Sequence, residues 1–388
     1  MHGTMITTMA APVTHNHCPR LLPVHELAAV TDTAAALSRH VWFEGRRPAP
    51  SSGTTSVAAK TRDAQFMHGC YACGKQRFRK RHGFYTSMCA QCGSEHYDLL
   101  VRGVREGTPT LAGFQALVVG GRTKIGYQVA LRLLRTGARV VVTTRFPDRV
   151  VFAAEPDWAV WAARLVVATL DLNRPAAEVA AATHALAAAH LGSGLDALFF
   201  VAAQTIRGIE RREPVAAVAA NRYGDSKHFH GPVNSWALTL GSVTPEEVEE
   251  VMRVNTTGPF VVTQVVLPLI VASTHPRKCI VNTHAREGMF SLFKSPRHPH
   301  TNVAKAGLHM LTHMIQTTFG SEVPCFGIDP GWISLDEYGE DGVPLGGRLP
   351  LTELDGAAKL TDPVLAPRGR VPTRGTVRHY KYGTVPRY

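Results

Sequence analysis

The sequence predicts an α/β protein in which a doubly wound parallel sheet fills residues 111–388, behind a small four-cysteine unit at 66–100. Two observations predict this organisation. From residue 111 onward, unbroken apolar runs alternate with amphipathic stretches rich in Ala and Leu, the pattern of buried parallel strands covered by helices on both faces. Ahead of them, four of the seven cysteines form two Cys-x2-Cys pairs.

The expected elements follow one another in order along the chain. Residues 1–65 are polar and rich in Ala, Thr and Ser, so we expect a partly disordered or helical arm there. The first strand is FQALVVGG, the next helix YQVALRLLRTGA and the second strand RVVVTTR, and the third and fourth strands are RLVVATLDL and LDALFFVAA. Strands alternating with helices in this way predict a Rossmann-type domain with a C-terminal extension.

The composition is that of a globular protein of 388 residues with a net charge of +12. The apolar run at 260–272 is shorter than the roughly 20 residues that span a bilayer, and the first thirty residues lack the pattern of a secretory signal. We therefore expect a cytoplasmic protein without a membrane partner. The basic excess is concentrated at 75–81 and 363–388, which favours solvated faces or anionic ligands over nucleic acid.

The cysteine pairs are separated by fifteen residues, the spacing of a four-thiolate zinc site. Each pair presents two sulfurs to one tetrahedral ion, and a glycine follows each pair where the chain must turn tightly. Four sulfur ligands leave no position for water, so we predict a structural zinc that folds a ribbon-like unit with a core of its own. Two redox-active pairs are the alternative. The predicted ligands are Cys70, Cys73, Cys89 and Cys92.

A glycine-containing turn follows the first expected strand and opens the next helix. It spans Gly120 to Gly126. Glycine lets the backbone approach a pyrophosphate, and the start of a helix supplies N–H groups and a positive dipole to hold it. Placed between an apolar strand and an amphipathic helix, the turn predicts a dinucleotide-binding site.

This turn, VGGRTKIG, resembles the TGxxxGIG turn of the short-chain dehydrogenase/reductase superfamily, with Lys124 in place of one glycine. The resemblance continues across most of 111–388. The segments AAQTIRG, NSW and HPHTNVAKAGLHMLT are similar to an atypical subgroup from bacteria, plants and fungi, whose bacterial members also carry paired CxxC motifs. This resemblance implies an oxidoreductase that acts on a small-molecule carbonyl or imine and assembles as a dimer or tetramer.

The resemblance also implies where a cofactor is held. Asp171 and Leu172 resemble the adenine contact, Lys305 resembles the lysine of the YxxxK motif, and Asp329-Pro330-Gly331 resembles the turn near the nicotinamide. The implied cofactor contacts are Gly120, Arg122, Lys124, Ile125, Gly126, Thr144, Arg145, Asp171, Leu172, Ala202, Ala203, Lys305, Pro330 and Gly331.

Charge favours NADP(H) over NAD(H). An NAD-selective enzyme places an acid at the end of the second strand, whereas this strand ends in Thr144 and Arg145. Arg145, with Arg122 and Lys124 in the turn, offers cations where a 2'-phosphate would lie. A solvated arginine at the end of a strand is the alternative for Arg145.

The catalytic positions depart from the superfamily. Thr301 stands where the tyrosine of YxxxK is expected, and Ala285 stands at the serine position. A threonine hydroxyl is far less acidic than a phenol, whose pKa is about 10, so Thr301 cannot replace the tyrosine through its own acidity. Histidine has a pKa suited to proton transfer, which makes His300, beside Thr301, a candidate.

The predicted catalytic set is therefore Lys305, Asn255, Thr301 and His300. Asn255 resembles the asparagine on the fourth helix of the superfamily, which belongs to its proton relay. His284 and His298 are further candidates, although His284 should point away from Ala285 on a regular strand. The competing function is a non-redox scaffold or sensor that binds NADP(H) and uses the zinc unit to bind a partner.

Overall fold

The computed structural model describes residues 69–74, 82–102, 110–192, 194–204, 235–290, 294–333 and 350–366. All of them belong to one compact unit, Thr55–Tyr388. The arm predicted at 1–65, most of the basic cluster at 75–81 and the part of the C-terminal extension beyond 366 lie outside the described residues.

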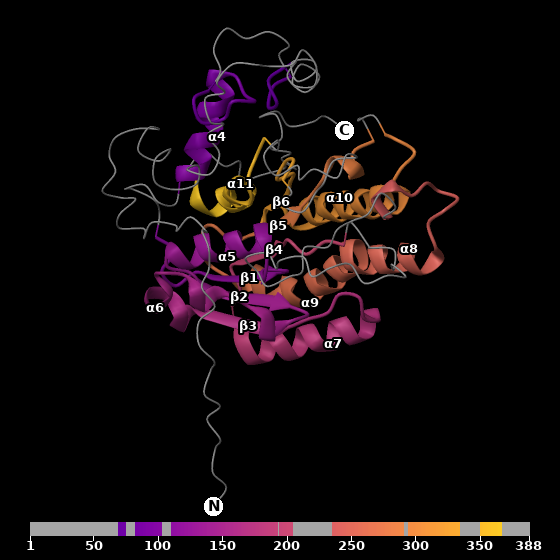
Figure 1. Ribbon diagram of the computed structural model, residues 1–388. Coiled ribbons are helices and arrows are strands. Elements are labelled where there is room, and N and C mark those ends of the chain that lie inside the picture. Colours follow the sequence, from indigo (N-terminus) through magenta and orange to yellow (C-terminus); the bar gives the residue numbers. More distant parts are fainter. Residues whose placement is uncertain are drawn as a thin grey trace, which may run out of the picture. The chain divides into compact units, whose positions relative to one another are not determined.

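A six-stranded parallel sheet lies at the centre, in the order β3-β2-β1-β4-β5-β6 (Figure 1). The strands are β1 (Gln115–Val119), β2 (Arg139–Thr144), β3 (Leu165–Thr169), β4 (Ala197–Phe200), β5 (Cys279–Thr283) and β6 (Cys325–Ile328). Every residue of β4, β5 and β6 is buried, as a sheet covered on both faces requires. The strand order reverses between β1 and β4, which confirms the doubly wound fold and leaves a crevice at the carboxyl ends of these strands.

Alternate residues of each strand face opposite layers of helices. On one face, Ala116 and Val118 share a core with α5 (Lys124–Arg135) and α11 (Glu353–Leu365). On the other, Leu117 shares a core with α7 (Ala176–Leu186), α9 (Gly258–Ala272) and α10 (Pro299–Phe319). Further helical segments of the described chain are α4 (Ala90–Val101), α6 (Trp158–Trp161), α8 (Pro245–Met252), the π-helical Ala187–Leu191 and Arg253–Thr257, and the 3-10 turns Pro147–Arg149, Phe152–Ala154, Ala162–Arg164, Ser235–Ala237 and Arg286–Gly288.

The apolar run at 260–272 belongs to a longer helical stretch, Pro245–Ala272. Within the described part of the chain, this stretch is the one helix long and apolar enough to cross a membrane by length and composition, with a mean hydropathy of 1.5. Half of its most apolar window is buried in the fold. Val262, Val266 and Ile270 lie in the core beneath the sheet, so the apolar composition has a structural explanation.

The four-cysteine unit, residues 69–74 and 82–102, shares a core with the sheet domain. Its buried cluster also contains Leu351, which lies just before α11, and contacts Ile333. The cluster is distinct from the two cores that flank the sheet, and residues of the sheet domain complete it. So short a segment has few apolar residues with which to close a core by itself.

Two polar contacts join the same unit to α11. The Tyr85 hydroxyl donates a hydrogen bond to the Asp355 carboxylate, and the Arg102 guanidinium pairs with the Asp362 carboxylate. Asp355 also accepts from Thr352 in the capping box that begins α11. The start of this helix is therefore fixed partly by the four-cysteine unit.

Candidate functional site

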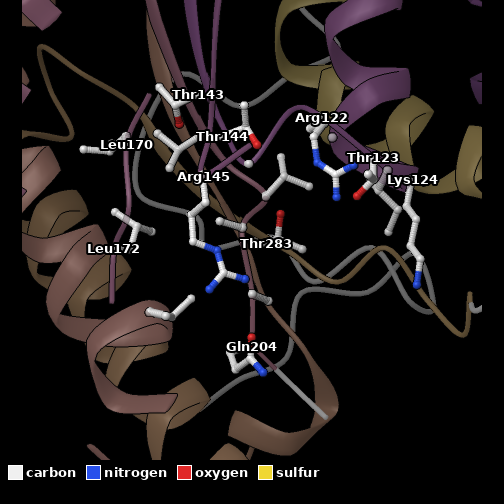
Figure 2. Close-up of a pocket in the computed structure, with 18 of the residues that line it drawn as sticks. Arg122, Thr123, Lys124, Thr143, Thr144, Arg145, Leu170, Leu172, Gln204 and Thr283 are labelled. Carbon is white, nitrogen blue, oxygen red and sulfur yellow. The ribbon is translucent and has the colours of Figure 1, made fainter. Parts of the chain in front are cut away.

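An open cavity of about 500 Å³, the glycine-turn pocket, lies at the carboxyl ends of the strands (Figure 2). Its lining comes from the segments after β1, β2, β3 and β4, the end of β5, α10, and Ile333 beyond β6. All the residues predicted to contact a cofactor line this pocket, except Pro330 and Gly331. The structure therefore brings together side chains that are far apart in the sequence.

The turn between β1 and α5 brings backbone to the pocket. Gly120 has a φ of +85°, and a Cβ there would lie 2.5 Å from the Cα of Ala202. A Cβ on Gly126 would lie 2.1 Å from the carbonyl oxygen of Gly120. Lys124, which replaces a glycine of the resembling turn, has a φ of +50°, so the backbone keeps the glycine-like conformation at some cost in strain. No side chain caps α5, which leaves its first turn suited to an anion.

Three arginines gather around the ring of Phe146. The guanidinium carbons of Arg149, Arg145 and Arg122 lie 4.7, 5.4 and 5.7 Å from its centroid. Figure 2 shows Arg145 extending from the end of β2 into the pocket, with Arg122 on another side. Arg149 and Phe146 were not among the predicted site residues, because neither belongs to a motif. Their position follows from the short turn Pro147–Arg149, which folds the chain back beside β2.

Lys305 lies at the other end of the pocket, on α10. Its side chain is 3% exposed, and its Nζ donates a hydrogen bond of 2.9 Å to the carbonyl oxygen of Thr283. Burial lowers the pKa of Lys305 from 10.5 to about 8, although the carboxylates of Glu287 and Asp329 act in the opposite direction. A buried amine of this kind can give up a proton near neutral pH.

Asn255 does not line the pocket. Its side chain accepts a hydrogen bond from the Gln204 N–H at 2.8 Å and donates one to the Gln204 carbonyl at 2.7 Å. Gln204 itself lines the pocket, in the segment after β4. The predicted catalytic asparagine therefore holds pocket backbone in place, a structural contact that a sequence motif does not distinguish from proton relay.

Two of the predicted catalytic residues, Thr301 and His300, do not line the pocket. Thr301 is 1% exposed, and its hydroxyl finds no hydrogen-bond partner among the described residues. It lies one helical turn before Lys305, but its short side chain stays within the packing of α10. His300 points instead toward Glu247 of α8, 3.6 Å away, and burial lowers its pKa in spite of that carboxylate.

The other two histidine candidates are engaged in packing. His284 lines the pocket, but its Nε2 lies 2.7 Å from the Thr312 hydroxyl, and its ring stacks on that of His309. Ala285, the next residue, also lines the pocket. His298 stacks on Trp236 at 3.9 Å between centroids, which supports a packing role for both rings.

The four cysteines of the predicted metal site come together in the structure. Their sulfur atoms all lie within 4.8 Å of one another, as one tetrahedral ion requires. Burial raises the pKa of the Cys70 thiol, but the backbone N–H groups of Cys73, Cys89 and Ala72 outweigh this and lower it to about 7. The lowered pKa favours the thiolate form of Cys70, which is the form that binds metal.

The unit around these sulfurs is not a β-ribbon in its described part. The first pair forms a turn that ends at Gly74, whose φ is +70°. The second pair begins a helix instead, because Cys89 is the N-cap of α4 and Cys92 lies in its first turn. Gly93 is needed here for space, since a Cβ would lie 2.2 Å from the Cβ of His82.

The strand order and the position of the pocket define the class of this molecule, a Rossmann-fold protein with an open site at the carboxyl ends of its strands. No family model matches the chain. An uncharacterized protein of Acanthamoeba polyphaga mimivirus is 30% identical over 339 residues, which cover 76% of this chain and 71% of the viral protein. The chain belongs to the same protein family as this viral protein.

Several solved structures are similar to part of the chain. A short-chain dehydrogenase from Shigella flexneri is 15% identical with a TM-score of 0.49, and the match covers 72% of this chain and 96% of that one. A short-chain dehydrogenase from Salmonella enterica serovar Typhi is 18% identical with a TM-score of 0.46, and the match covers 60% of this chain and 85% of that one. RhlG of Pseudomonas aeruginosa, in an active-site complex with NADP, is 25% identical with a TM-score of 0.40, and the match covers 57% of this chain and 73% of that one.

Proposed function

We propose that this protein is an NADP(H)-dependent oxidoreductase of the short-chain dehydrogenase/reductase type, acting on a small carbonyl or imine compound. One observation carries the proposal: a single pocket runs from the glycine turn and its arginines to the buried amine of Lys305. The turn suits a pyrophosphate, and the arginines suit a further phosphate. The amine lies where proton transfer would be needed.

The residues fit NADP(H) better than NAD(H). β2 ends at Thr144 and Arg145 follows it, so no carboxylate stands there to accept hydrogen bonds from ribose hydroxyls. Arg145 and Arg122 line the pocket, and Arg149 adds a third positive charge beside them. Leu170, Asp171 and Leu172 after β3 would flank the adenine.

The reaction follows from the residues at the other end of the pocket. NADPH, when bound, would be the source of the hydride for the substrate carbon. The oxygen or nitrogen of the substrate then gains a proton. We assign Lys305 as its donor, because the Nε2 atom of His284, the other candidate near the end of β5, is bonded to the Thr312 hydroxyl. The Thr283 carbonyl orients the ammonium. An imine would react more readily than a ketone, since a protonated C=N is already electrophilic.

Removing the Arg145 guanidinium is expected to reduce NADPH affinity selectively. Arg145→Ala should weaken NADPH binding by about 1.5–3 kcal/mol, the value of a charge-assisted hydrogen bond, and change NADH binding little. Titration calorimetry with both cofactors measures the difference. Arg174→Ala is the matched control, because it removes an arginine that pairs with Glu178 on the surface, outside the pocket lining. An equal loss for both cofactors would show that Arg145 is only structural.

Thr301 is expected to be dispensable for turnover. Thr301→Val should leave kcat within about threefold of the wild type and should not lower stability, because the buried hydroxyl has no partner among the described residues. Steady-state kinetics and thermal unfolding test this. A loss of about 10²-fold or more in kcat with unchanged NADPH affinity would mean that Thr301 relays a proton after all.

The decisive experiment for the function is NADPH binding followed by NADPH oxidation on a panel of aldehydes, ketones and imines. Binding with stoichiometric oxidation on one class supports the oxidoreductase. Binding without oxidation on any class supports the scaffold or sensor instead, which the absence of Thr301 and His300 from the pocket lining favours. Failure to bind NADPH contradicts both.

Zinc at the four cysteines and self-association complete the proposal. The sulfur cluster fits a closed, structural Zn²⁺ ion.

On α10, Val303, Met310 and Met314 are each more than half exposed and lie on one face of the helix. Such an apolar stripe supports a homo-oligomer.

A further inference from the structure

The turn at 329–333, which follows β6, contacts the four-cysteine unit. The Trp332 N–H donates a hydrogen bond of 2.7 Å to the hydroxyl oxygen of Tyr71, the residue directly after Cys70. Gly331 has a φ of +97°, and a Cβ there would lie 3.0 Å from the same hydroxyl oxygen. The first Cys-x2-Cys turn is therefore closely fitted to the 329–333 turn.

The same turn forms part of the pocket wall through Ile333. This side chain lines the glycine-turn pocket and also packs against the buried cluster that contains Cys70 and Cys89. From the side of α11, the Lys359 Nζ donates a hydrogen bond of 2.9 Å to the Pro330 carbonyl. The turn is thus held between α11 and Tyr71, and a shift of Tyr71 would be transmitted to the pocket wall.

A second connection joins the other cysteine pair to the helix of the glycine turn. Cys89 is the N-cap residue of α4, and the backbone carbonyls in the last turn of a helix have no partners within that helix. Arg132 of α5 donates hydrogen bonds to the carbonyls of Leu100 at 2.9 Å and Leu99 at 3.3 Å. Because α5 begins at the glycine turn, both cysteine pairs contact elements that shape the pocket.

We infer that metal binding at the four cysteines and dinucleotide binding in the pocket are thermodynamically coupled, with Tyr71 as a positioning residue between them. This inference rests on the proposed function. A metal ion fixes the turn that carries Tyr71, and Tyr71 in turn fixes Trp332 and Ile333 at the pocket. Coupling is reciprocal, so the factor by which metal tightens NADPH binding equals the factor by which NADPH tightens metal binding.

The first experiment uses the full chain loaded with zinc and follows zinc release to a chromogenic chelator. Saturating NADPH is expected to slow release about 5- to 20-fold, within the usual range of coupling between sites. Tyr71→Phe should keep one zinc per chain and nearly the wild-type release rate without NADPH, because the ring remains. It should also lose most of the slowing by NADPH.

Tyr97→Phe is the matched control. Tyr97, like Tyr71, packs against the buried cluster of the four-cysteine unit, where its ring lies near those of Phe84 and His82. We expect this variant to release zinc like the wild type, both with and without NADPH. A merely structural effect of removing a tyrosine hydroxyl would alter basal release in either variant, whereas coupling changes only the response of Tyr71→Phe to NADPH.

NADPH affinity gives the second readout. Tyr71→Phe should bind NADPH about 3- to 10-fold more weakly than the wild type, and Tyr97→Phe should bind it equally well. If NADPH binds but changes neither the rate of zinc release nor the affinity for zinc, the coupling is refuted and the proposed function stands. If NADPH does not bind at all, the proposed function fails as well.

Discussion

Replacing Lys305 by methionine is expected to lower turnover by about 10³-fold and, at the same time, to stabilise the fold. Turnover falls because the substrate loses its proton donor. Stability rises because an ammonium held at a pKa of about 8 instead of 10.5 is disfavoured by burial at neutral pH. This penalty is about 3 kcal/mol, and losing the hydrogen bond to Thr283 offsets about 1 kcal/mol of the gain. Steady-state kinetics and denaturant unfolding measure both effects.

The pH dependence has a definite sign. Because the lowered pKa is about 8, reduction, which needs the ammonium, should be nearly constant below pH 7 and fall tenfold per pH unit above about 8. Oxidation, which needs the neutral amine, should rise through the same range. Stability should increase between about pH 8 and 10.5, where the unfolded chain binds more protons than the folded one.

Lys305→Arg separates proton transfer from charge. Arginine keeps the positive charge but does not deprotonate in this pH range. NADPH binding should persist, while turnover and its dependence on the Lys305 pKa should be lost. If Lys305→Met retains wild-type turnover with an unchanged pH profile, the proton comes from water or from the substrate, and Lys305 only holds the cofactor.

Replacing Cys89 by serine is expected to remove zinc and unfold the four-cysteine unit. The wild type should contain one zinc per chain by elemental analysis, and Cys89→Ser close to none, since a closed site with three thiolates binds zinc far more weakly. The free energy of unfolding should fall by about 5 kcal/mol. Finding no zinc in wild-type protein purified without chelator would contradict the metal site.

The effect of this change should extend into the sheet domain. Loss of the unit removes the hydrogen bond from Tyr85 to Asp355 and the packing of Leu351, so α11 should lose protection from hydrogen exchange. Cys279→Ala is the matched control, because Cys279 is buried in β5, away from the cluster. It should cost about 1–2 kcal/mol in packing and leave the zinc content unchanged.

The sheet, the glycine turn and the cysteine cluster could all be predicted from local patterns in the sequence. Each depends on local chemistry: strands buried on both faces must be continuously apolar, a backbone turn in the left-handed region needs glycine, and thiolates at this spacing can share one ion. Even Lys124, which breaks the glycine pattern, adopts the conformation of the residue it replaces. The position of Arg145 at the pocket was also predictable, because the carboxyl end of a strand lies at the edge of the crevice.

Local patterns did not predict which of the catalytic candidates line the pocket. Thr301 and Lys305 lie one turn apart on α10, yet Lys305 lines the pocket and Thr301 does not. His300 is turned toward Glu247 by its position around the helix. The contact between Tyr71 and Trp332 joins segments 261 residues apart, and no pattern local to either segment specifies it. Such contacts depend on how whole elements pack, and the sequence therefore predicts the scaffold more fully than the site.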